Sequence, residues 1–465
     1  MSTMTATTSP APKPNLAPQT LRLLQAPPAK LLLLLALPNI GEAAARIAFI
    51  TFDAVFVGRL GTDALAGLGL VMPLFFLMQT TTAGGLGVGA SATLARALGR
   101  GARHDADAAV GIAALLAFGM AACFMLVMLV FGRTIYSAMG GSGGALQAAL
   151  DYSFVMFLGA PFVCLTNVLA NIVRGTGNMK VPAGTIIVGE ALHLSLSPVL
   201  IGGLGPIPSL GMTGAALAAL TPYAFGTIVL ALYLTRRSGL VRFRRTPEAD
   251  RRGLTMEMLK IGGTASLVSL SMQIMTLVFT GYVGRYGAEA LAAYGTAARL
   301  ELIQIPLVFA FGSALIALVG TNLGAGRIDR AKRIAWLGAG YGLAISGIIG
   351  LGAALAPSLW MGLFSATPPV EAIGGDFLRI VAPAFLLFGP GLALYFALQA
   401  AGRVLWVLFA SLVRVAITLG GGFIVLASGG SLLALFACVS AGYVAYGLIV
   451  LAVMRLVRWP GESAR

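Results

Sequence analysis

The stretch that decides the fold reads FVGRLGTDALAGLGL at residues 56–70, and it recurs as YVGRYGAEALAAYGT at residues 282–296, displaced by 226 positions. ALGRG at 97–101 is likewise matched by NLGAG at 322–326, and VRGTG at 173–177 stands opposite LQAAG at 398–402, each displaced by 225. Three separate matches at nearly one displacement indicate two homologous halves. The basic segment 236–256 then joins them.

The composition of the chain indicates lipid as its solvent. Hydrophobic residues make up 58% of the 465 positions, charged residues only 10%, and the mean hydropathy is +0.92. A soluble domain needs roughly 25% charged residues, and a membrane-spanning helix needs about 20 mostly apolar ones. The 61 glycines suit close helix packing in lipid, and alternating strands of a transmembrane barrel are missing.

Polar breaks between the apolar runs give the number of spans. They fall near residues 59–63, 96–107, 133–147, 174–180, 204–210, 236–256, 284–289, 324–333, 356–371, 401–403 and 427–431. The fold class is therefore an all-α membrane protein with twelve transmembrane helices in two homologous six-helix lobes. An even number of helices in each lobe predicts an axis along the membrane normal, as in known transporters.

The repeat and the breaks also set the predicted domain boundaries. We expect a disordered cytoplasmic tail over 1–28, an N-terminal lobe over 29–236, a basic cytoplasmic linker over 237–256, a C-terminal lobe over 257–458 and a second tail over 459–465. A cavity between two lobes that rock against each other is the place to expect a transported substrate.

The net charge of +15 reflects how the chain is oriented in the membrane. Most Lys and Arg residues, Arg96 and Arg174 among them, fall on one side of the predicted membrane, and only Arg59, Arg133 and Arg285 fall on the other. The positive-inside rule then predicts a multi-pass protein of the bacterial inner membrane with both termini in the cytoplasm. The charge indicates contact with anionic lipid, and no nucleic acid partner is expected.

The first predicted span carries three charged residues, Glu42, Arg46 and Asp53. Each costs about 2.5–3.5 kcal/mol at a helix centre. Around the helix axis Arg46 lies about 40° and Asp53 about 20° from Glu42, so all three face the bundle interior, with Asn39 beside them. Glu42 and Arg46 either neutralise each other or take part in ion coupling. Asp53 has no basic neighbour one turn away, which favours a coupling role over a static ion pair.

Further polar residues fall in other spans. Glu190 and His193 lie one turn apart in the fifth span. The alternatives for this pair are a proton relay, part of a cation site, or a structural hydrogen bond. Asn167 and Asn171 in the fourth span either line the same cavity or bond across helices. In the eighth span Arg299 and Glu301 are too close in sequence to face each other. We expect Asn39, Asn167, Asn171, Glu190, His193 and Glu301 at a substrate cavity.

For Arg299 the alternatives are an approach to Asp53 or a snorkelling side chain, and Arg379 and Arg414 have no partner that the sequence reveals. Enzyme chemistry finds no support: phosphate-binding loops are missing, and neither His104 nor His193 has zinc-ligand spacing. We therefore expect no cofactor, no metal and no catalytic residue.

The chain resembles the multidrug and toxic compound extrusion (MATE) family over residues 30–457. The resemblance rests on FDAVFVGRLGTDALAGLGL at 52–70, GLGVGASATLARALGRG at 85–101, RGTGNMKVP at 174–182 and ALQAAGRV at 397–404. It implies two lobes forming an outward-opening V and drug export driven by protons or sodium.

Within that family Asp53 matches the cation-coupling position of a DinF-like subgroup, and Arg299 falls where some of its members have a basic residue. The sequence departs from the family in the fifth span, where an Asn followed by Asp-Pro is replaced by His193, Ser197 and Pro198. Losing that carboxylate favours protons over sodium, and Glu190 with His193 are candidates to replace it.

The first functional hypothesis is a monomeric, proton-coupled exporter of small amphipathic organic compounds, cationic ones among them. It rests on one charged interior stripe without a dedicated polar cage for a single ligand. The alternative is a flippase of lipid-linked sugars or another organic-anion carrier of the same superfamily, which predicts a strongly basic cavity instead of one of mixed sign.

Overall fold

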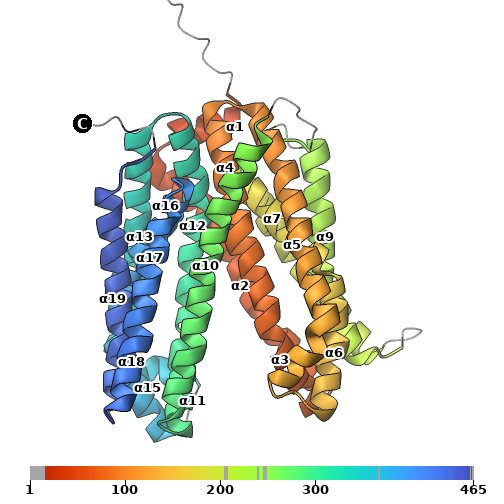
Figure 1. The fold of residues 1–465 in the computed structure, drawn as a ribbon, viewed down its shortest axis with the longest axis vertical. Helices are drawn as coiled ribbons and strands as arrows, with labels where there is room; N and C mark the ends of the chain where they lie inside the picture. Colours follow the sequence, from red (N-terminus) through yellow and green to blue (C-terminus); the bar gives the residue numbers. More distant parts are fainter. Residues whose placement is uncertain are drawn as a thin grey trace, which may run out of the picture.

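The computed structural model describes residues 16–203, 208–237, 240–243, 249–364, 367–460 and 462, with the side chains of 47–55 and 237 left out of the description. Helices make up nearly all of this part of the chain. Two bundles of long helices lie side by side (Figure 1).

The N-terminal lobe contains six spans. They are α2 (Pro28–Gly58); α3 (Thr62–Gln79) continued by the π-helical turn η1 (Thr80–Gly87) and α4 (Val88–Arg100); α5 (Arg103–Ala138); the pair α6 (Gly143–Leu158) and α7 (Ala160–Gly175); α8 (Lys180–Gly202); and α9 (Gly211–Leu232) with η2 (Tyr233–Arg237). Because α6 and α7 meet at a 51° bend, they form one broken span.

The C-terminal lobe repeats this order. Its spans are α10 (Arg251–Gly284); α11 (Ala288–Ala298) with α12 (Glu301–Gly324); α13 (Ile328–Leu355), followed by the short α14 (Pro357–Met361); α15 (Pro368–Val381), η3 (Ala382–Ala384) and α16 (Phe385–Ala400); α17 (Val404–Val415), η4 (Ala416–Gly420) and α18 (Gly421–Ala427); and α19 (Leu432–Leu456). Counting the bent pair once, the described residues contain twelve helices able to cross a membrane. The predicted fold class is confirmed.

The repeat is visible in backbone geometry. Gly61 and Gly287 lie in the turns that follow the matched first spans of the two lobes, with φ of 113° and 106°, a region that favours glycine. Gly101 and Gly326 occupy a second matched turn, with φ of 76° and 72°. The same residues of each half therefore build the same turns.

The two lobes converge at one end and diverge at the other, so that they form a V (Figure 1). Helix α1 and the C-terminus both lie at the converging end. This end also holds the tightest contact between the lobes, where α4 crosses α12.

Two glycines related by the repeat make this crossing possible. A side chain added at Gly99 would overlap the carbonyl oxygen of Thr321, and one added at Gly324 would overlap the carbonyl oxygen of Arg96. The contact is thus reciprocal, as across a two-fold axis. An ion pair between Arg96 Nη2 and Glu257 Oε1 (2.5 Å) joins α4 to α10 beside it.

Residues 18–25, predicted to belong to a disordered tail, instead form the helix α1 (Pro18–Gln25). Its apolar face buries Leu23 and Leu24. Asn322 Nδ2 donates to the Leu23 carbonyl (3.4 Å), and Arg327 Nη1 donates to the Leu24 carbonyl (2.9 Å). These contacts with the C-terminal lobe satisfy carbonyls at the end of a helix too short to be stable alone. The rest of the predicted tail, residues 1–15, lies outside the described residues.

Candidate functional site

A cavity of about 340 Å³ lies between the lobes. Its N-terminal-lobe wall comes from α2, η1, α4 and α7, and its C-terminal-lobe wall from α12 and α16. We call it the interlobe cavity. It is lined by Asn39, Glu42, Ala43, Arg46, Ala83, Gly84, Val88, Asn171, Arg174, Ile305, Pro306, Phe309, Ala310, Ser313, Ile316 and Phe396.

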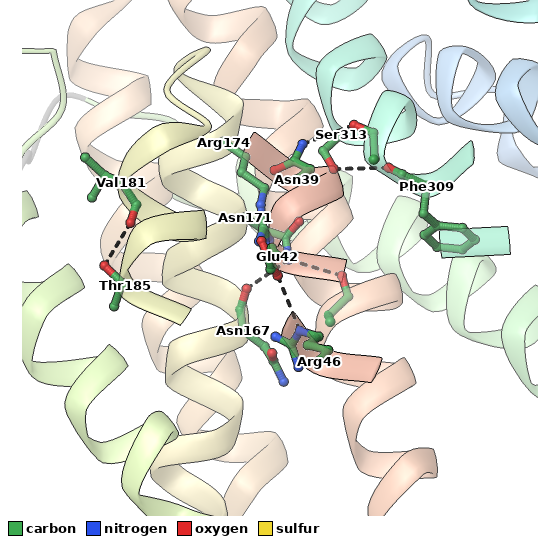
Figure 2. Close-up of polar contacts among 12 residues, drawn as sticks. Asn39, Glu42, Arg46, Asn167, Asn171, Arg174, Val181, Thr185, Phe309 and Ser313 are labelled. Carbon is green, nitrogen blue, oxygen red and sulfur yellow. Dashed lines mark hydrogen bonds and ion pairs between the residues drawn. The ribbon is translucent and has the colours of Figure 1, made fainter. Parts of the chain in front are cut away.

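Glu42 lies at the centre of the polar wall, between two guanidinium groups (Figure 2). Arg174 Nη2 donates to Glu42 Oε2 at 2.6 Å, and Arg46 Nε donates to Glu42 Oε1 at 3.4 Å. The side chains of Glu42 and Arg174 are only 10% and 12% exposed, whereas that of Arg46 is 31% exposed. The predicted Glu42–Arg46 pair is present, but the shorter partner of Glu42 is Arg174.

Arg174 was placed by the sequence on the cytoplasmic side of the membrane, with no role at the site. The residue lies in the last turn of α7, which extends to Gly175, and its side chain turns back into the interlobe cavity. Because the aliphatic part of the arginine side chain is long, the guanidinium extends from the end of α7 to the carboxylate of Glu42. The sequence gave no sign of this role, because Arg174 lies at the edge of a polar break.

Amide side chains surround this ion-pair cluster. Asn39 Nδ2 donates to the Ala310 carbonyl of α12 (3.1 Å), which links the lobes directly. Asn171 Nδ2 donates to the Asn167 carbonyl (2.8 Å) and to the Ala83 carbonyl of η1 (3.3 Å). Asn39 and Asn171 therefore both line the interlobe cavity.

Asn167 lies behind the cavity wall, inside the N-terminal lobe. Its Nδ2 donates to Gln79 Oε1 (2.5 Å) and to Thr82 Oγ1 (3.3 Å), and Gln79 in turn donates to the Tyr223 hydroxyl. Tyr223 interacts electrostatically with Arg46. A polar network thus extends from the cavity into the lobe through α2, α3, α7 and α9.

Glu190 and His193 also belong to the interior of this lobe. Both are buried in α8, which packs against α2, and neither lines the interlobe cavity. Glu190 interacts electrostatically with Arg46. Arg46 therefore has two acidic neighbours, Glu42 on its own helix α2 and Glu190 on the adjacent helix α8.

The opposite wall of the cavity is apolar and aromatic. Phe309 of α12 and Phe396 of α16 form an edge-to-face pair with ring centroids 4.8 Å apart. At the repeat displacement of 225, Asn171 corresponds to Phe396, so the two lobes place an amide and a phenyl ring at matched positions of the same cavity. The duplicated fold has become chemically asymmetric at the site.

Glu301 lies in a separate cluster within the C-terminal lobe and does not line the interlobe cavity. The Tyr443 hydroxyl donates to Glu301 Oε1 at 2.5 Å. Arg414, 4% exposed, places its guanidinium 4.2 Å from the Tyr443 ring centroid and 4.9 Å from that of Phe388. These cation–π contacts account for Arg414, whose partners the sequence did not reveal.

Arg299 is exposed, and its guanidinium lies 5.4 Å from the Phe364 ring centroid of the same lobe. The predicted approach of Arg299 to Asp53 is not described, since Asp53 belongs to α2 but its side chain is outside the described part. Among the described residues, no three or more His, Cys, Asp or Glu side chains are grouped so that they could hold a metal ion.

Sequence reasoning missed the π-helical turn η1, which contributes Ala83 and Gly84 to the cavity. Thr80, Thr81 and Thr82 each donate to carbonyls three and four residues earlier. Such back-bonding loosens the regular helical ladder, and π-turns are frequent at functional sites. The run TTTAGG at 80–85 was the available signal.

Two six-helix lobes that enclose a polar and aromatic cavity in the membrane define a transporter-type fold. The MatE family model matches residues 38–199 and 265–424, one segment in each lobe. The chain belongs to this family, the multidrug and toxic compound extrusion transporters.

Individual proteins agree with this assignment. The chain is 29% identical to a probable multidrug resistance protein, YoeA, of Bacillus subtilis, over 75% of this chain and 76% of that protein. It is also 29% identical to an FAD transporter of Shewanella oneidensis, over 81% and 82%. A solved structure of a MOP superfamily transporter from Pyrococcus furiosus superposes with a TM-score of 0.86 at 22% identity, covering 95% of this chain and 98% of that one.

Proposed function

We propose that the protein exports small amphipathic organic compounds across the bacterial inner membrane in exchange for protons. The observation that carries this proposal is the two-sided interlobe cavity, with Glu42, Arg46 and Arg174 on one wall and Phe309 and Phe396 on the other. A molecule with one polar and one apolar side satisfies both walls, whereas a fully polar solute leaves the aromatic wall unmatched.

Alternating access supplies the transport cycle. The lobes meet through the Gly99 and Gly324 contacts at the end that carries α1 and the C-terminus, and they diverge at the other. Because the basic residues are concentrated toward the closed end, the positive-inside rule favours its placement in the cytoplasm. The conformation described is then open to the outside, and rocking of the lobes about the cavity would open it inward.

Proton coupling is assigned to the charged groups of α2. A carboxylate in a membrane interior is stable either as a partner of a guanidinium or as the neutral acid. Glu42 has two such partners, and Arg46 is shared with Glu190. A proton or a substrate that breaks one of these ion pairs therefore also changes how the remaining charged groups pair with one another. Asp53, on the same helix, remains the candidate for proton uptake from the open side.

Asp53→Asn is expected to abolish coupling. The amide keeps the shape of the side chain but can neither bind nor release a proton, so the pH gradient can no longer drive the transport cycle. Efflux of a fluorescent drug into everted vesicles, driven by an imposed pH gradient, should fall at least tenfold. The conservative variant Asp53→Glu should retain part of the activity. Wild-type rates in Asp53→Asn would remove Asp53 from the coupling mechanism.

An organic-anion carrier is the second candidate function, and a specific observation favours it. The charged side chains among the described lining residues are one carboxylate and two guanidinium groups, which leaves a positive balance. A similar protein is an FAD transporter, and FAD is an anion with a large aromatic part. This composition is less basic than a dedicated anion site requires, so we rank it second.

The relative transport of a cation and an anion by the wild type separates the two candidates, and Arg46→Gln tests whether this cavity determines it, because Arg46 is the more exposed of the two guanidinium groups. Removing its charge should lower the efflux ratio of anion to cation, measured in the same vesicles with a dinucleotide and a lipophilic cation. For an exporter of amphipathic cations, transport of the cation exceeds that of the dinucleotide in the wild type, and the variant increases this difference. Arg285→Gln, an exposed change outside the cavity, should leave the ratio unaltered. A wild type that transports only the dinucleotide would establish the second candidate.

A further inference from the structure

A second hollow lies on the outside of the N-terminal lobe, near the closed end. It has a volume of about 600 Å³ and is formed by one face of α5 between Ala108 and Phe118, by Leu165 of α7, by Phe243 of the linker and by Arg251 at the start of α10. We call it the α5 groove. Apart from Arg251, the lining consists of apolar side chains and one glycine, Gly111.

Small residues and a fixed linker create this groove. Around Gly111 of α5 there is open space, since a side chain added there would meet no atom within 4 Å. The linker is fastened to the lobe because Val241 is fully buried and the Arg242 backbone N–H donates to Asp107 Oδ1 at 2.7 Å. Phe243, 56% exposed, then forms an apolar wall instead of packing into the core.

The dimensions and the polarity of the groove fit one leaflet of a membrane. From Ala108 to Phe118 an α-helix rises about 15 Å, which is half of the roughly 30 Å hydrocarbon thickness. Leu115 and Phe118 are 72% and 55% exposed, as expected for side chains in contact with lipid. Arg251 is the first residue of α10, and an arginine at the end of a membrane helix extends its guanidinium toward the lipid head groups.

Arg251 has an unused positive charge. No ion pair joins it to a carboxylate among the described residues, and it occupies the first turn of α10, which contains no acidic residue. The N-cap carboxylate of Asp250 accepts from the Gly253 N–H and compensates the helix end, so the Arg251 guanidinium itself is the cationic group of the groove. An apolar channel that ends at an arginine is complementary to an acyl chain attached to a phosphate.

We propose that the α5 groove binds one anionic phospholipid, with an acyl chain along α5 and its phosphate at Arg251. Such a lipid contacts the N-terminal lobe, the linker and the first residue of the C-terminal lobe together. The proposal rests on the membrane fold and is independent of the transported substrate and of the coupling ion.

Delipidated full-length protein in detergent, titrated with phosphatidylglycerol or with phosphatidylcholine of the same acyl chains, tests this site by native mass spectrometry. The wild type should bind phosphatidylglycerol about fivefold more tightly, as one arginine near a membrane surface predicts. Arg251→Gln should remove this preference and leave binding of phosphatidylcholine unchanged. Arg458→Gln, an equally exposed charge change outside the groove, should keep the preference.

The apolar part is tested by Gly111→Leu, which fills the groove and should lower binding of both lipids. Gly119→Leu is the matched control, because Gly119 is on the same helix, has equally open surroundings and does not line the groove. Equal binding of the two lipids by the wild type, equal loss of preference in Arg251→Gln and Arg458→Gln, or unchanged lipid binding in Gly111→Leu would each overturn the proposal. A change of oligomeric state in place of lipid binding would assign the groove to a second copy of the chain.

Discussion

Glu42→Gln is expected to abolish transport and to destabilise the protein. The change leaves the Arg174 guanidinium, now 2.6 Å from the carboxylate, and that of Arg46 without an anion in the cavity wall. Removing one partner of a buried ion pair costs about 3–5 kcal/mol, because the other charge stays buried. Drug efflux from proteoliposomes should fall at least tenfold, and the unfolding temperature in detergent should drop. Glu289→Gln, the same chemical change at an exposed position, should affect neither.

The double variant Glu42→Gln, Arg174→Gln separates charge neutralisation from coupling. It removes both members of the short ion pair, so most of the lost stability should return. Transport should remain absent, because Glu190 is then the one described carboxylate near Arg46, and Arg46 has no second anion with which to exchange partners. If efflux recovers together with stability, Glu42 serves only to neutralise Arg174, and the exchange mechanism at this position is wrong.

The membrane fold was predictable from the sequence because local features determine it. Each of the eleven predicted breaks coincides with a change of helix or with the linker, since a polar run cannot remain in lipid. The repeat could also be recognised from the sequence. Matched turns need a positive φ at Gly61 and at Gly287, and both halves therefore keep a glycine there. Helix α1 escaped prediction because its stability depends on Asn322 and Arg327, about 300 residues away in the chain.

The site was only partly predictable. The charged stripe of α2 could be recognised, since charged residues in a span require partners, and Asn39, Glu42 and Arg46 do line the cavity. Which residue pairs with which depends on how the helices pack, and the sequence does not contain that information in local form. Arg174 was therefore counted only among the basic residues of one membrane side, and Glu301 was assigned to the cavity although it bonds to Tyr443 inside its own lobe.

Gly99→Ala and Gly324→Ala are expected to shift the protein away from the closed-end conformation described. A single methyl group at either position would overlap a backbone carbonyl oxygen of the opposite lobe, and a backbone cannot give way as a flexible side chain can. Overpacking of this kind costs about 1–3 kcal/mol, which lowers the population of the closed conformation roughly 5- to 150-fold. Because the contacts are reciprocal, the two variants should behave alike.

Distances between spin labels report this shift directly. Labels at Lys180 and Arg333, exposed residues at the starts of α8 and α13, should move apart at the closed end in a cysteine-free background. Labels at Asp63 and Glu289, exposed at the starts of α3 and α11, should approach each other. Gly340→Ala is the matched control, because a methyl group there meets nothing within 4 Å. Wild-type distances in Gly99→Ala, or an equal shift in Gly340→Ala, would show that the glycine crossing does not hold the lobes together.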